Sequence, residues 1–572
     1  MAKFDEGLAF LMPGTARGFR PAPRSTDIAP EFRAAPWLGA IVASEHEAHA
    51  LDLYRFVRGY REFKTARNCV LFKSFPVLVE NFEYYGKIPM AREQIILSGA
   101  SALRVRMKLA KKLDEGEVEA DLGARRQADG TDPLHRRAFL KPRDLGLPFL
   151  IECRNFFNFY HFTTESLIYL QMYRDYGLTG PIWLFTSSRR EGKAFIRKAV
   201  RDFYPDLADR VEMKVGSLSV PRAIIPFNTN HLYHQTTAER FPDIELEAGF
   251  ARIDTPGALR PATVDNYKFI YNNSRDEYID RHREQVLAGL PSTERRRLYV
   301  GRRPGAGKDR PLLGEKALVA MLARYGFAHV YLEDYSPGQQ AQLCQDAEIL
   351  VSAHGAGFAN MTYARPGAWF IELSHLQTAR HRFGDFNMHA SVSGARYMHF
   401  FADHDTQADE VPSMEEDGHA GIAMSAWAID RLEGLIAIIV DPDAYRAANR
   451  GMAQALKRQR PEQALALLAE KPAYAQGCAR ICALAADAAL AQGDPQVALA
   501  HLAQALRVAP YRADLWERRH DLAKSLGREA EAQDIHRMMS LYHPFRFMRW
   551  TRDGHGVAMI QAPKSAGKGG AE

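Results

Sequence analysis

A short glycine turn is the part of this sequence best suited to chemistry. Residues 348–353 form an apolar run that suggests a buried parallel strand, and the turn HGAG at residues 354–357 follows it directly. Two glycines allow a sharp turn and a close approach of the backbone to a ligand. Residues 358–363 are expected to begin a helix, whose N-terminus offers free N–H groups and the positive end of a dipole. The stretch therefore predicts an anion site, and we expect the diphosphate of an activated sugar there.

Four turn residues are the candidates for contact with this ligand: His354, Gly355, Ala356 and Gly357. The histidine is expected to hydrogen-bond a phosphate or a sugar hydroxyl. The alternative is a histidine that satisfies backbone groups of the turn.

Charged side chains end the strands expected beside this turn. Arg302 and Arg303 close a strand predicted from residue 297. Ligands of open parallel sheets bind outside the carboxyl ends of the strands. An arginine there can pair bidentately with a diphosphate and stabilise the leaving nucleotide without a metal. We favour Arg302 over Arg303 and take Arg310 as a third candidate. Glu372 ends the strand after the turn, where it would either accept hydrogen bonds from ribose hydroxyls or simply be a charged strand end.

The glycine turn is only part of a dinucleotide-binding fingerprint. Asn360 stands where that fingerprint has its third glycine, which disfavours a nucleotide-dependent oxidoreductase. Asn360 would either cap the following helix or contact the donor, and the sequence leaves both open. The segment GAGKD at residues 305–309 lacks the spacing of a P-loop. Residues 403–405 and 441–443 match the Asp-x-Asp of metal-dependent transferases in letters only, and we expect solvated loops.

A second candidate centre lies upstream, on a helix predicted over residues 155–176. His161 and Glu165 are four residues apart and therefore share one face of that helix. Transfer to a hydroxyl needs a base that removes its proton as it attacks. Either residue could serve as that base while the other orients it. The alternative is a pair buried against the neighbouring aromatic side chains.

Two β/α alternations would position these residues, and each predicts an open parallel sheet covered by helices. We expect an N-terminal Rossmann-like domain over residues 1–265 for the acceptor. A second Rossmann-like domain over residues 266–445 would bind the nucleotide-sugar. A helical region over residues 446–561 and a disordered tail over residues 562–572 follow. The fold class is thus α/β with an α-helical appendix.

The C-terminal region repeats with a period of 34 residues. Ala464, Ala498 and Ala532 stand 34 apart in turn, Gly493 recurs as Gly527, and a proline at residue 510 recurs at residue 544. Small residues at this period are typical of tetratricopeptide-like paired helices. We expect two good repeats and a degenerate first one. They would serve protein docking or self-association, or else form a helical cap on the catalytic part.

Composition narrows the class of protein. Of the 572 residues, 46% are apolar and 25% charged, and the net charge is +6, so nothing indicates nucleic-acid binding. Five scattered cysteines favour a reducing compartment over a disulfide framework. The sequence has neither a secretory signal nor a run of 18 apolar residues. We expect a cytoplasmic protein, with a peripheral position at the inner membrane face left open.

The ordered motifs of the middle of the chain resemble glycosyltransferase family 61. The matching positions are 299–303, Arg310, Glu315, Gln340, Ala347, 354–357, Asn360, 366–367 and Glu372. Residues 158–161 (NFYH) with Glu165 look like a second motif of that family. The resemblance covers roughly residues 155–374. It departs at Gly314, where the family usually has an asparagine, so a donor contact or a helix start is expected to differ there.

This resemblance implies a GT-B fold, inversion at the anomeric carbon and no metal or other cofactor. It implies a UDP-sugar donor and a growing surface or capsular glycan, or a lipid-linked one, as the acceptor. The family includes the EGF-domain O-GlcNAc transferase, plant xylan side-chain transferases and many bacterial polysaccharide enzymes. The main alternative is a transferase-like protein that has lost activity and acts as a repeat-containing scaffold.

Overall fold

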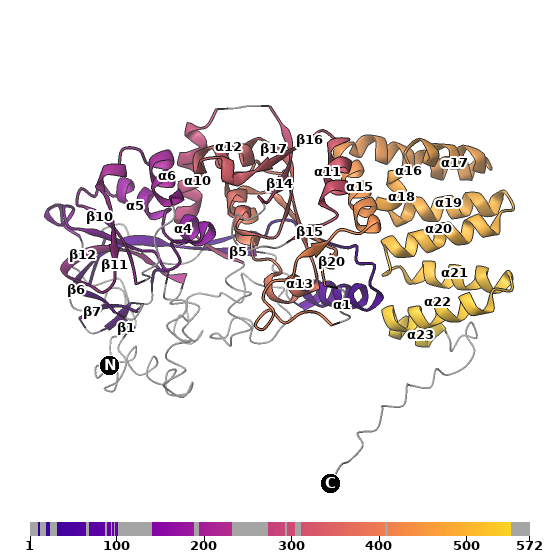
Figure 1. Ribbon diagram of the computed structural model, residues 1–572, viewed down its shortest axis with the longest axis horizontal. Helices are drawn as coiled ribbons and strands as arrows, with labels where there is room; N and C mark the ends of the chain where they lie inside the picture. Colours follow the sequence, from indigo (N-terminus) through magenta and orange to yellow (C-terminus); the bar gives the residue numbers. More distant parts are fainter. Residues whose placement is uncertain are drawn as a thin grey trace, which may run out of the picture.

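The structure, a computed structural model, describes most of the chain. The described residues are 10–11, 19–22, 31–63, 68–85, 88–92, 94–96, 98–100, 140–187, 194–230, 273–291, 294–303, 311–406 and 410–550. Arg310 and the tail at residues 562–572 lie outside them. Within this part, three bodies stand side by side: a first sheet with its helices, a second sheet with its helices, and a stack of helices (Figure 1). Its helices include none with the length and apolar character needed to cross a membrane.

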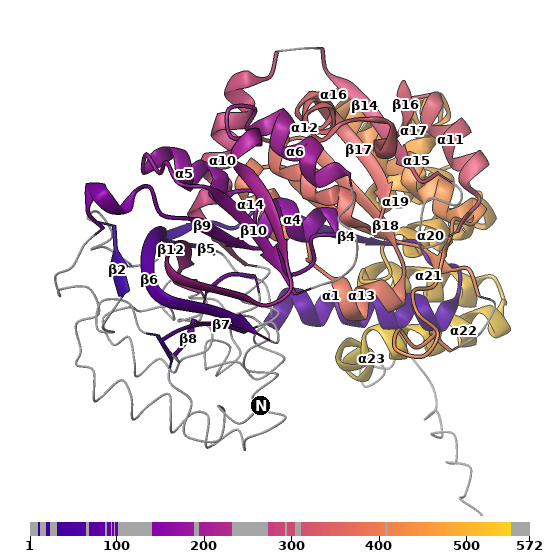
Figure 2. The ribbon, with the colours of Figure 1, turned by 60° about the vertical axis from the view of Figure 1, so that its left-hand side comes forward.

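The first sheet has nine strands and is mixed. The strand order is β1-β8-β7-β6-β12-β9-β10-β11, with β2 paired to β6. The strands are β1 (Phe10–Leu11), β2 (Phe19–Pro21), β6 (Ser74–Tyr85), β7 (Ile88–Ala91), β8 (Gln94–Ile96), β9 (Phe149–Glu152), β10 (Ile182–Thr186), β11 (Val211–Val215) and β12 (Leu218–Asn228). Strands β9, β10 and β11 pair in parallel, as expected, but β6 pairs antiparallel with β12 and β7. The prediction of a purely parallel first sheet was therefore wrong for its longer strands, which Figure 2 shows curving together.

Helices from two parts of the chain cover one face of this sheet. They are α4 (Phe159–Glu165), α5 (Tyr169–Asp175), α6 (Phe195–Phe203) and α10 (Glu277–Gly289). The single helix predicted over residues 155–176 is split, because the chain leaves helical geometry at Ser166, whose hydroxyl donates to the Glu152 carbonyl at 2.7 Å. A side chain that bonds to backbone outside its helix competes with the helical ladder.

The second sheet has six strands and is parallel throughout. Its order is β16-β14-β17-β18-β19-β4. The strands are β4 (Leu38–Val42), β14 (Arg296–Gly301), β16 (Phe327–Tyr331), β17 (Ala347–Ala353), β18 (Trp369–Ser374) and β19 (Arg396–Phe401). Both faces are buried: α11 (Glu315–Ala323) and α15 (Ala426–Val440) cover one, while α12 (Pro337–Asp346), the 3-10 helix η6 (Ala356–Tyr363) and α14 (Asn387–Ser393) cover the other. Burial on both faces explains the nearly continuous apolar strands.

One strand of the second sheet comes from the N-terminal part of the chain. Strand β4 pairs in parallel with β19, with Leu38 opposite Tyr397 and Val42 opposite Phe401. Helix α1 (Glu47–Phe63) follows it and packs on α13 (Leu376–Arg382). The predicted domain limit at residue 265 therefore assigned this strand to the wrong sheet. Sequence distance hides the pairing, because more than 350 residues separate the two strands.

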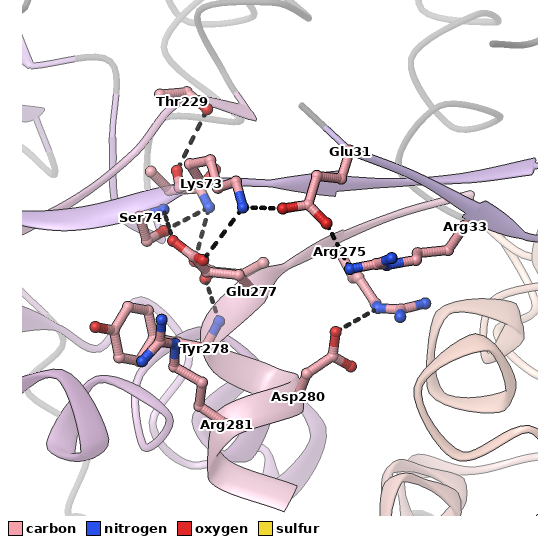
Figure 3. A network of polar contacts seen from close by, with 12 residues as sticks. Glu31, Arg33, Lys73, Ser74, Thr229, Arg275, Glu277, Tyr278, Asp280 and Arg281 are labelled. Carbon is pink, nitrogen blue, oxygen red and sulfur yellow. Dashed lines mark hydrogen bonds and ion pairs between the residues drawn. The ribbon is translucent and has the colours of Figure 1, made fainter. Parts of the chain in front are cut away.

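A small sheet and a polar network join the two larger sheets. The small sheet has the order β13-β5-β3, with β3 (Glu31–Ala34), β5 (Asn68–Phe72) and β13 (Ser274–Asp276). Beside it, Lys73 contacts Glu31 and lies 3.8 Å from the Glu277 carboxylate, which also accepts from the Ser74 N–H at 2.8 Å (Figure 3). Because Glu277 opens α10, the network anchors the start of the chain that leads into the second sheet. A last small sheet, β15-β21-β20, contains β15 (Leu312–Leu313), β20 (Asp403–His404) and β21 (Ile422–Ala423).

The C-terminal region is a stack of antiparallel helix pairs, as the 34-residue period predicts (Figure 1). Its helices are α16 (Pro442–Lys457), α17 (Pro461–Glu470), α18 (Ala473–Gly477), α19 (Ala479–Ala491), α20 (Pro495–Val508), α21 (Ala513–Ser525), α22 (Glu529–Tyr542) and α23 (Pro544–Trp550). The alanines at the repeat period are buried at equivalent positions of α17, α20 and α22. Only a small side chain lets the paired helices approach this closely.

Candidate active site

The glycine turn lies where β17 ends and η6 begins. Gly355 has an extended backbone with φ 175°, so it is not a glycine for a left-handed turn. It is needed for space instead, because a Cβ there would stand 2.8 Å from the Arg302 guanidinium, and one on Gly357 would stand 2.9 Å from Leu332. The predicted close approach of the backbone is present, but here a neighbouring arginine rather than a ligand is the group approached.

Arg302 and His354 are brought together at the carboxyl edge of the second sheet. The guanidinium donates to the His354 carbonyl oxygen. Burial lowers the pKa of Arg302, although an arginine remains charged at neutral pH. A cation beside the N-terminus of η6 gives this edge the electrostatics expected of an anion site. Ala356 is the first residue of η6, next to both groups.

Glu372 lies beneath His354 and does not face solvent. Its side chain is 0% exposed, and Oε1 lies 3.0 Å from His354 Nδ1. Burial raises the pKa of this carboxyl, but the neighbouring His354 and His399 outweigh burial and hold it well below its usual range. In this geometry Glu372 faces His354 and its neighbours, and direct contact with ribose hydroxyls stays a prediction. An ionised Glu372 instead fixes the orientation of the His354 ring through the contact with Nδ1.

Two further residues complete the pairing of Glu372, and the sequence reading missed both. Tyr397 donates to Glu372 Oε2 at 2.6 Å, and His399 Nδ1 lies 3.2 Å from Oε1. The Gly384 N–H donates to His399 Nε2, so a neutral His399 carries its proton on the side of Glu372. The sequence could have indicated them, because they are polar residues on strands that are otherwise apolar and buried on both faces.

The other predicted donor contacts lie apart from this cluster. Arg303 is exposed and pairs with Asp334, with its guanidinium 4.8 Å from the centre of the Tyr331 ring. Asn360 is buried, and its amide donates to Gln340 Oε1 at 3.0 Å. Gln340 is itself oriented by donating to two backbone carbonyls, which settles a structural role for it. Asn360 does not cap η6, whose first residue follows Gly355.

The second candidate centre is present on the first sheet. His161 Nδ1 lies 2.7 Å from Glu165 Oε1, as the four-residue spacing predicts. Arg154, which the sequence reading missed, donates to the same carboxylate oxygen at 2.9 Å. It follows β9 by two residues, so the rule that selected Arg302 at the end of a strand would also have found it. The His161 side chain is 24% exposed, whereas Arg154 is nearly buried at 6%.

The pairing determines which nitrogen of His161 can act as a base. The Arg154 guanidinium also lies 3.1 Å from Nδ1, but the shorter 2.7 Å contact is with a carboxylate, which accepts hydrogen bonds only, so we assign the proton of Nδ1 to the bond with Glu165. Nε2 of the neutral ring is then the atom with a free lone pair. This is the arrangement by which a buried carboxylate orients a general-base histidine.

The two centres meet across Phe386. The Tyr160 ring, next to His161, stands 5.8 Å from Phe386, and the His354 ring stands 5.4 Å from it. Helix α4 also packs against η6, whose Phe358 stacks on Phe386. The end of η6 is also tied to the first sheet, because buried His282 bridges Tyr363 and Tyr204 with contacts of 2.7 and 2.6 Å. The predicted acceptor and donor residues are thus neighbours from different sheets.

Comparison with known proteins identifies the middle of the chain. The family model described as Glycosyltransferase 61 matches residues 159–371. No curated protein matches the chain. The matched segment begins with the helix that carries His161 and Glu165, contains Arg302 and His354, and ends one residue before Glu372. Residues 159–371 are therefore similar to glycosyltransferase family 61.

Proposed function

We propose that this glycosyltransferase moves a sugar from a nucleotide-sugar to a hydroxyl of a glycan, with inversion at the anomeric carbon. The observation that carries the proposal is the meeting of two polar centres across Phe386: an arginine and a histidine on one side, and a histidine–carboxylate pair on the other. A sugar transfer needs these two functions, a cationic site for the leaving diphosphate and a base for the acceptor.

The donor would lie with its diphosphate at the carboxyl edge of the second sheet. Arg302 and the first N–H groups of η6 would hold the phosphate oxygens. The ring of His354, oriented by Glu372 through Nδ1, would lie beside Arg302 at the leaving diphosphate. UDP-sugars are the first donors to test, because the family resemblance implies them.

The acceptor hydroxyl would lie against His161. As the acceptor oxygen forms its bond to the anomeric carbon, Nε2 takes the hydroxyl proton and the bond from that carbon to the diphosphate oxygen breaks. The bonding electron pair leaves with the nucleoside diphosphate. Attack from the side opposite the leaving group inverts the anomeric carbon. Charge on the diphosphate is stabilised by Arg302 and the first N–H groups of η6, so the scheme assigns no step to a metal. A surface or capsular glycan, free or lipid-linked, is the acceptor class we propose.

Calorimetry with nucleotide-sugars tests the donor side. UDP-glucose, UDP-xylose and UDP-N-acetylglucosamine are titrated into the full chain with and without EDTA. We expect binding that EDTA leaves unchanged, and loss of that binding in Arg302→Ala. His501→Ala in the repeat region (in α20) is the matched control. Binding that requires a divalent cation would contradict the metal-free scheme, and binding of NAD instead would favour an oxidoreductase.

The acceptor side is tested with the same variants. His161→Ala is expected to retain donor affinity and to lower the rate of donor hydrolysis or transfer by about 10²–10⁴-fold, the usual contribution of a general base. Full turnover in both His161→Ala and Glu165→Ala would exclude this pair as the base. If the unchanged protein binds nucleotide-sugars no better than a variant with His354 and Arg302 both changed to Ala, the inactive-scaffold alternative holds.

A further inference from the structure

One position of the helical repeat differs between the first repeat and the two that follow it. Residues 477, 511 and 545 are spaced by 34 and follow equivalent helices, and they are Gly477, Tyr511 and Phe545. Gly477 packs on α15, where a Cβ would stand 2.5 Å from the carbonyl oxygen of Gly434. The first repeat therefore uses this position to attach the stack to the catalytic part. In the next two repeats the same position carries an aromatic ring.

Those two rings are unusually exposed. Tyr511 is 59% exposed and Phe545 79%, and together with Met548 at 58% they are the most exposed large hydrophobic side chains of the described residues. The outer surface of a helical repeat is normally polar. Two aromatic rings at equivalent positions of successive helix pairs therefore form a repeated surface feature rather than isolated exposed residues.

An arginine follows each ring, and each arginine is held by a carboxylate. The two motifs read Pro-Tyr-Arg at residues 510–512 and Pro-Phe-Arg at residues 544–546. Arg512 donates to both oxygens of Asp514, at 2.8 and 2.6 Å, and Arg546 to both oxygens of Glu517, at 2.7 and 3.2 Å. Each of the two motifs thus presents an aromatic ring beside an arginine–carboxylate pair that is fixed in position and nearly neutral in charge.

The two motifs are adjacent in space and lie beside helix α1. His543, just before the second motif, contacts the carbonyl oxygen of Pro510 in the first at 2.8 Å. The ring of Tyr54 in α1 is nearly parallel to that of Tyr511, with 4° between the planes and 6.5 Å between the centroids. In Figure 1 the ends of α20 and α22 that lead into these motifs point toward α1 and the second sheet, not away from them.

We propose that the two Pro-aromatic-Arg motifs form a binding edge for the glycan acceptor, outside the active site. The faces of Tyr511 and Phe545 would stack on the apolar faces of sugar rings, and the Arg512–Asp514 and Arg546–Glu517 pairs would exchange hydrogen bonds with hydroxyl groups. This inference rests on the proposed function for the nature of the acceptor. An edge of this kind holds a long glycan while its end is extended.

The charges favour a glycan over other partners. An anionic membrane or a nucleic acid is bound by unpaired Lys and Arg side chains, whereas both arginines here are neutralised by a bidentate carboxylate. Sugar rings combine apolar faces with hydroxyl groups that donate and accept, which matches a ring next to an ion pair. The two motifs therefore fit a polyhydroxylated chain with little charge.

Affinity electrophoresis tests the edge in the full chain. The protein is run through native gels that contain dextran, xylan or hyaluronan. We expect retardation in at least one of the uncharged polysaccharides, dextran or xylan, and loss of most of it in Tyr511→Ser/Phe545→Ser. The matched control, Leu490→Ser/Val497→Ser, changes two hydrophobic residues that are each 41% exposed in α19 and α20 and lie outside both motifs. It should migrate like the unchanged protein.

Several outcomes would overturn the edge. They are migration unaffected by all three polysaccharides, equal retardation of both double variants, and flotation with phosphatidylglycerol vesicles that Tyr511→Ser/Phe545→Ser loses. A dimer in light scattering that Tyr511→Ser/Phe545→Ser converts to monomer, without retardation, would assign the edge to self-association. Donor calorimetry separates the two proposals, because failure of the edge leaves nucleotide-sugar binding intact. Failure of donor binding with the edge still functional would instead refute the proposed function.

Discussion

At the scale of single residues, Glu372 shows how a buried charge can act through its neighbours. It lies on the buried face of β18 and is held ionised by two histidines and a tyrosine. An isolated carboxylate at this depth would be too costly to keep charged, whereas a paired one fixes the rings around it. Glu372 is therefore a positioning residue for His354, and its replacement should affect both stability and the orientation of the His354 ring.

The variant Glu372→Gln tests this role through its pH dependence. Because the pKa of Glu372 is depressed in the folded protein, its stabilisation is fully present above its ordinary pKa and is lost as pH falls toward the folded value. At pH 7 we expect the variant to lose about 3 kcal/mol of unfolding free energy in urea. The difference should shrink below about pH 4.5. Glu348→Gln, which removes a partly exposed pair with Arg297, should cost less than about 1 kcal/mol.

Gly314 explains the departure from the family motif in physical terms. It has φ +82° and precedes α11, and asparagine is the other residue that adopts this left-handed region readily. A Cβ at Gly314 would stand 2.3 Å from the Met424 carbonyl oxygen, so the family's asparagine would collide with backbone here. The pairing of β15 with β21 brings the two chains this close.

Replacing each of two left-handed glycines with asparagine distinguishes the cost of backbone strain from the cost of a steric collision. Gly314→Asn should lose about 2 kcal/mol or more of stability, since backbone must move to relieve the contact. Gly326→Asn provides the control, because Gly326 has φ +76° but open space around the position of its Cβ. It should lose less than about 1 kcal/mol. Thermal unfolding of both variants measures the difference, and equal losses would contradict the steric explanation.

At the scale of elements, the repeat region shows how far a pattern of residue types can predict a repeating backbone. Gly493 and Gly527 connect their helix pairs with φ +79° and +69°, and the equivalent position of the first pair is Gln459, with φ +55°. The left-handed backbone conformation therefore occurs in all three helix pairs, although glycine occupies this position in only two of them. A comparison of residue types finds the first repeat degenerate because glutamine replaces glycine at a position that still adopts the left-handed region.

Gln459→Gly is expected to stabilise the protein. A left-handed glutamine costs roughly 1–2 kcal/mol, part of which is offset by the greater freedom of glycine in the unfolded chain. We expect a net gain of about 0.5–1 kcal/mol in unfolding free energy, measured by urea denaturation. The reverse change, Gly493→Gln, should lose a similar amount, because no atom lies within 4 Å of the Cβ it would add. Loss of stability in both variants would refute the equivalence of the two positions.

The positions of strand ends determine which parts of the candidate site can be predicted from the sequence. Apolar periodicity and strand ends suffice to bring Arg302 and His354 to one edge, because both close neighbouring parallel strands. The pattern cannot show whether a polar residue near a strand end faces solvent or the sheet. Glu372, expected to contact the donor, and Asn360, expected either to contact the donor or to cap a helix, are both buried. Arg154 enters the second centre from a segment that the motifs did not single out.

At the scale of the whole molecule, α1 connects the repeats to the catalytic sheet. It follows β4, the edge strand of that sheet, and its Leu51 packs in the same apolar cluster as Leu502, Leu515 and Ile535 of the repeats. Glu47 of α1 pairs with Arg537 of α22. The sequence could not reveal this arrangement, because the interacting segments lie at opposite ends of the chain.

Because α1 contacts the repeats and follows the edge strand of the sheet, we expect it to couple the unfolding of these two parts. Leu51→Asp would place a charge in the shared apolar cluster, so we expect the repeats and the sheet to unfold independently of each other. Calorimetry should then show two thermal transitions where the unchanged protein shows one. Arg537→Gln, which removes an exposed ion pair at the same interface, should change stability by less than about 1 kcal/mol and keep a single transition. If Leu51→Asp lowers one shared transition without splitting it, the two parts are coupled mainly through the α15 contact at Gly434 and Gly477 instead of through α1.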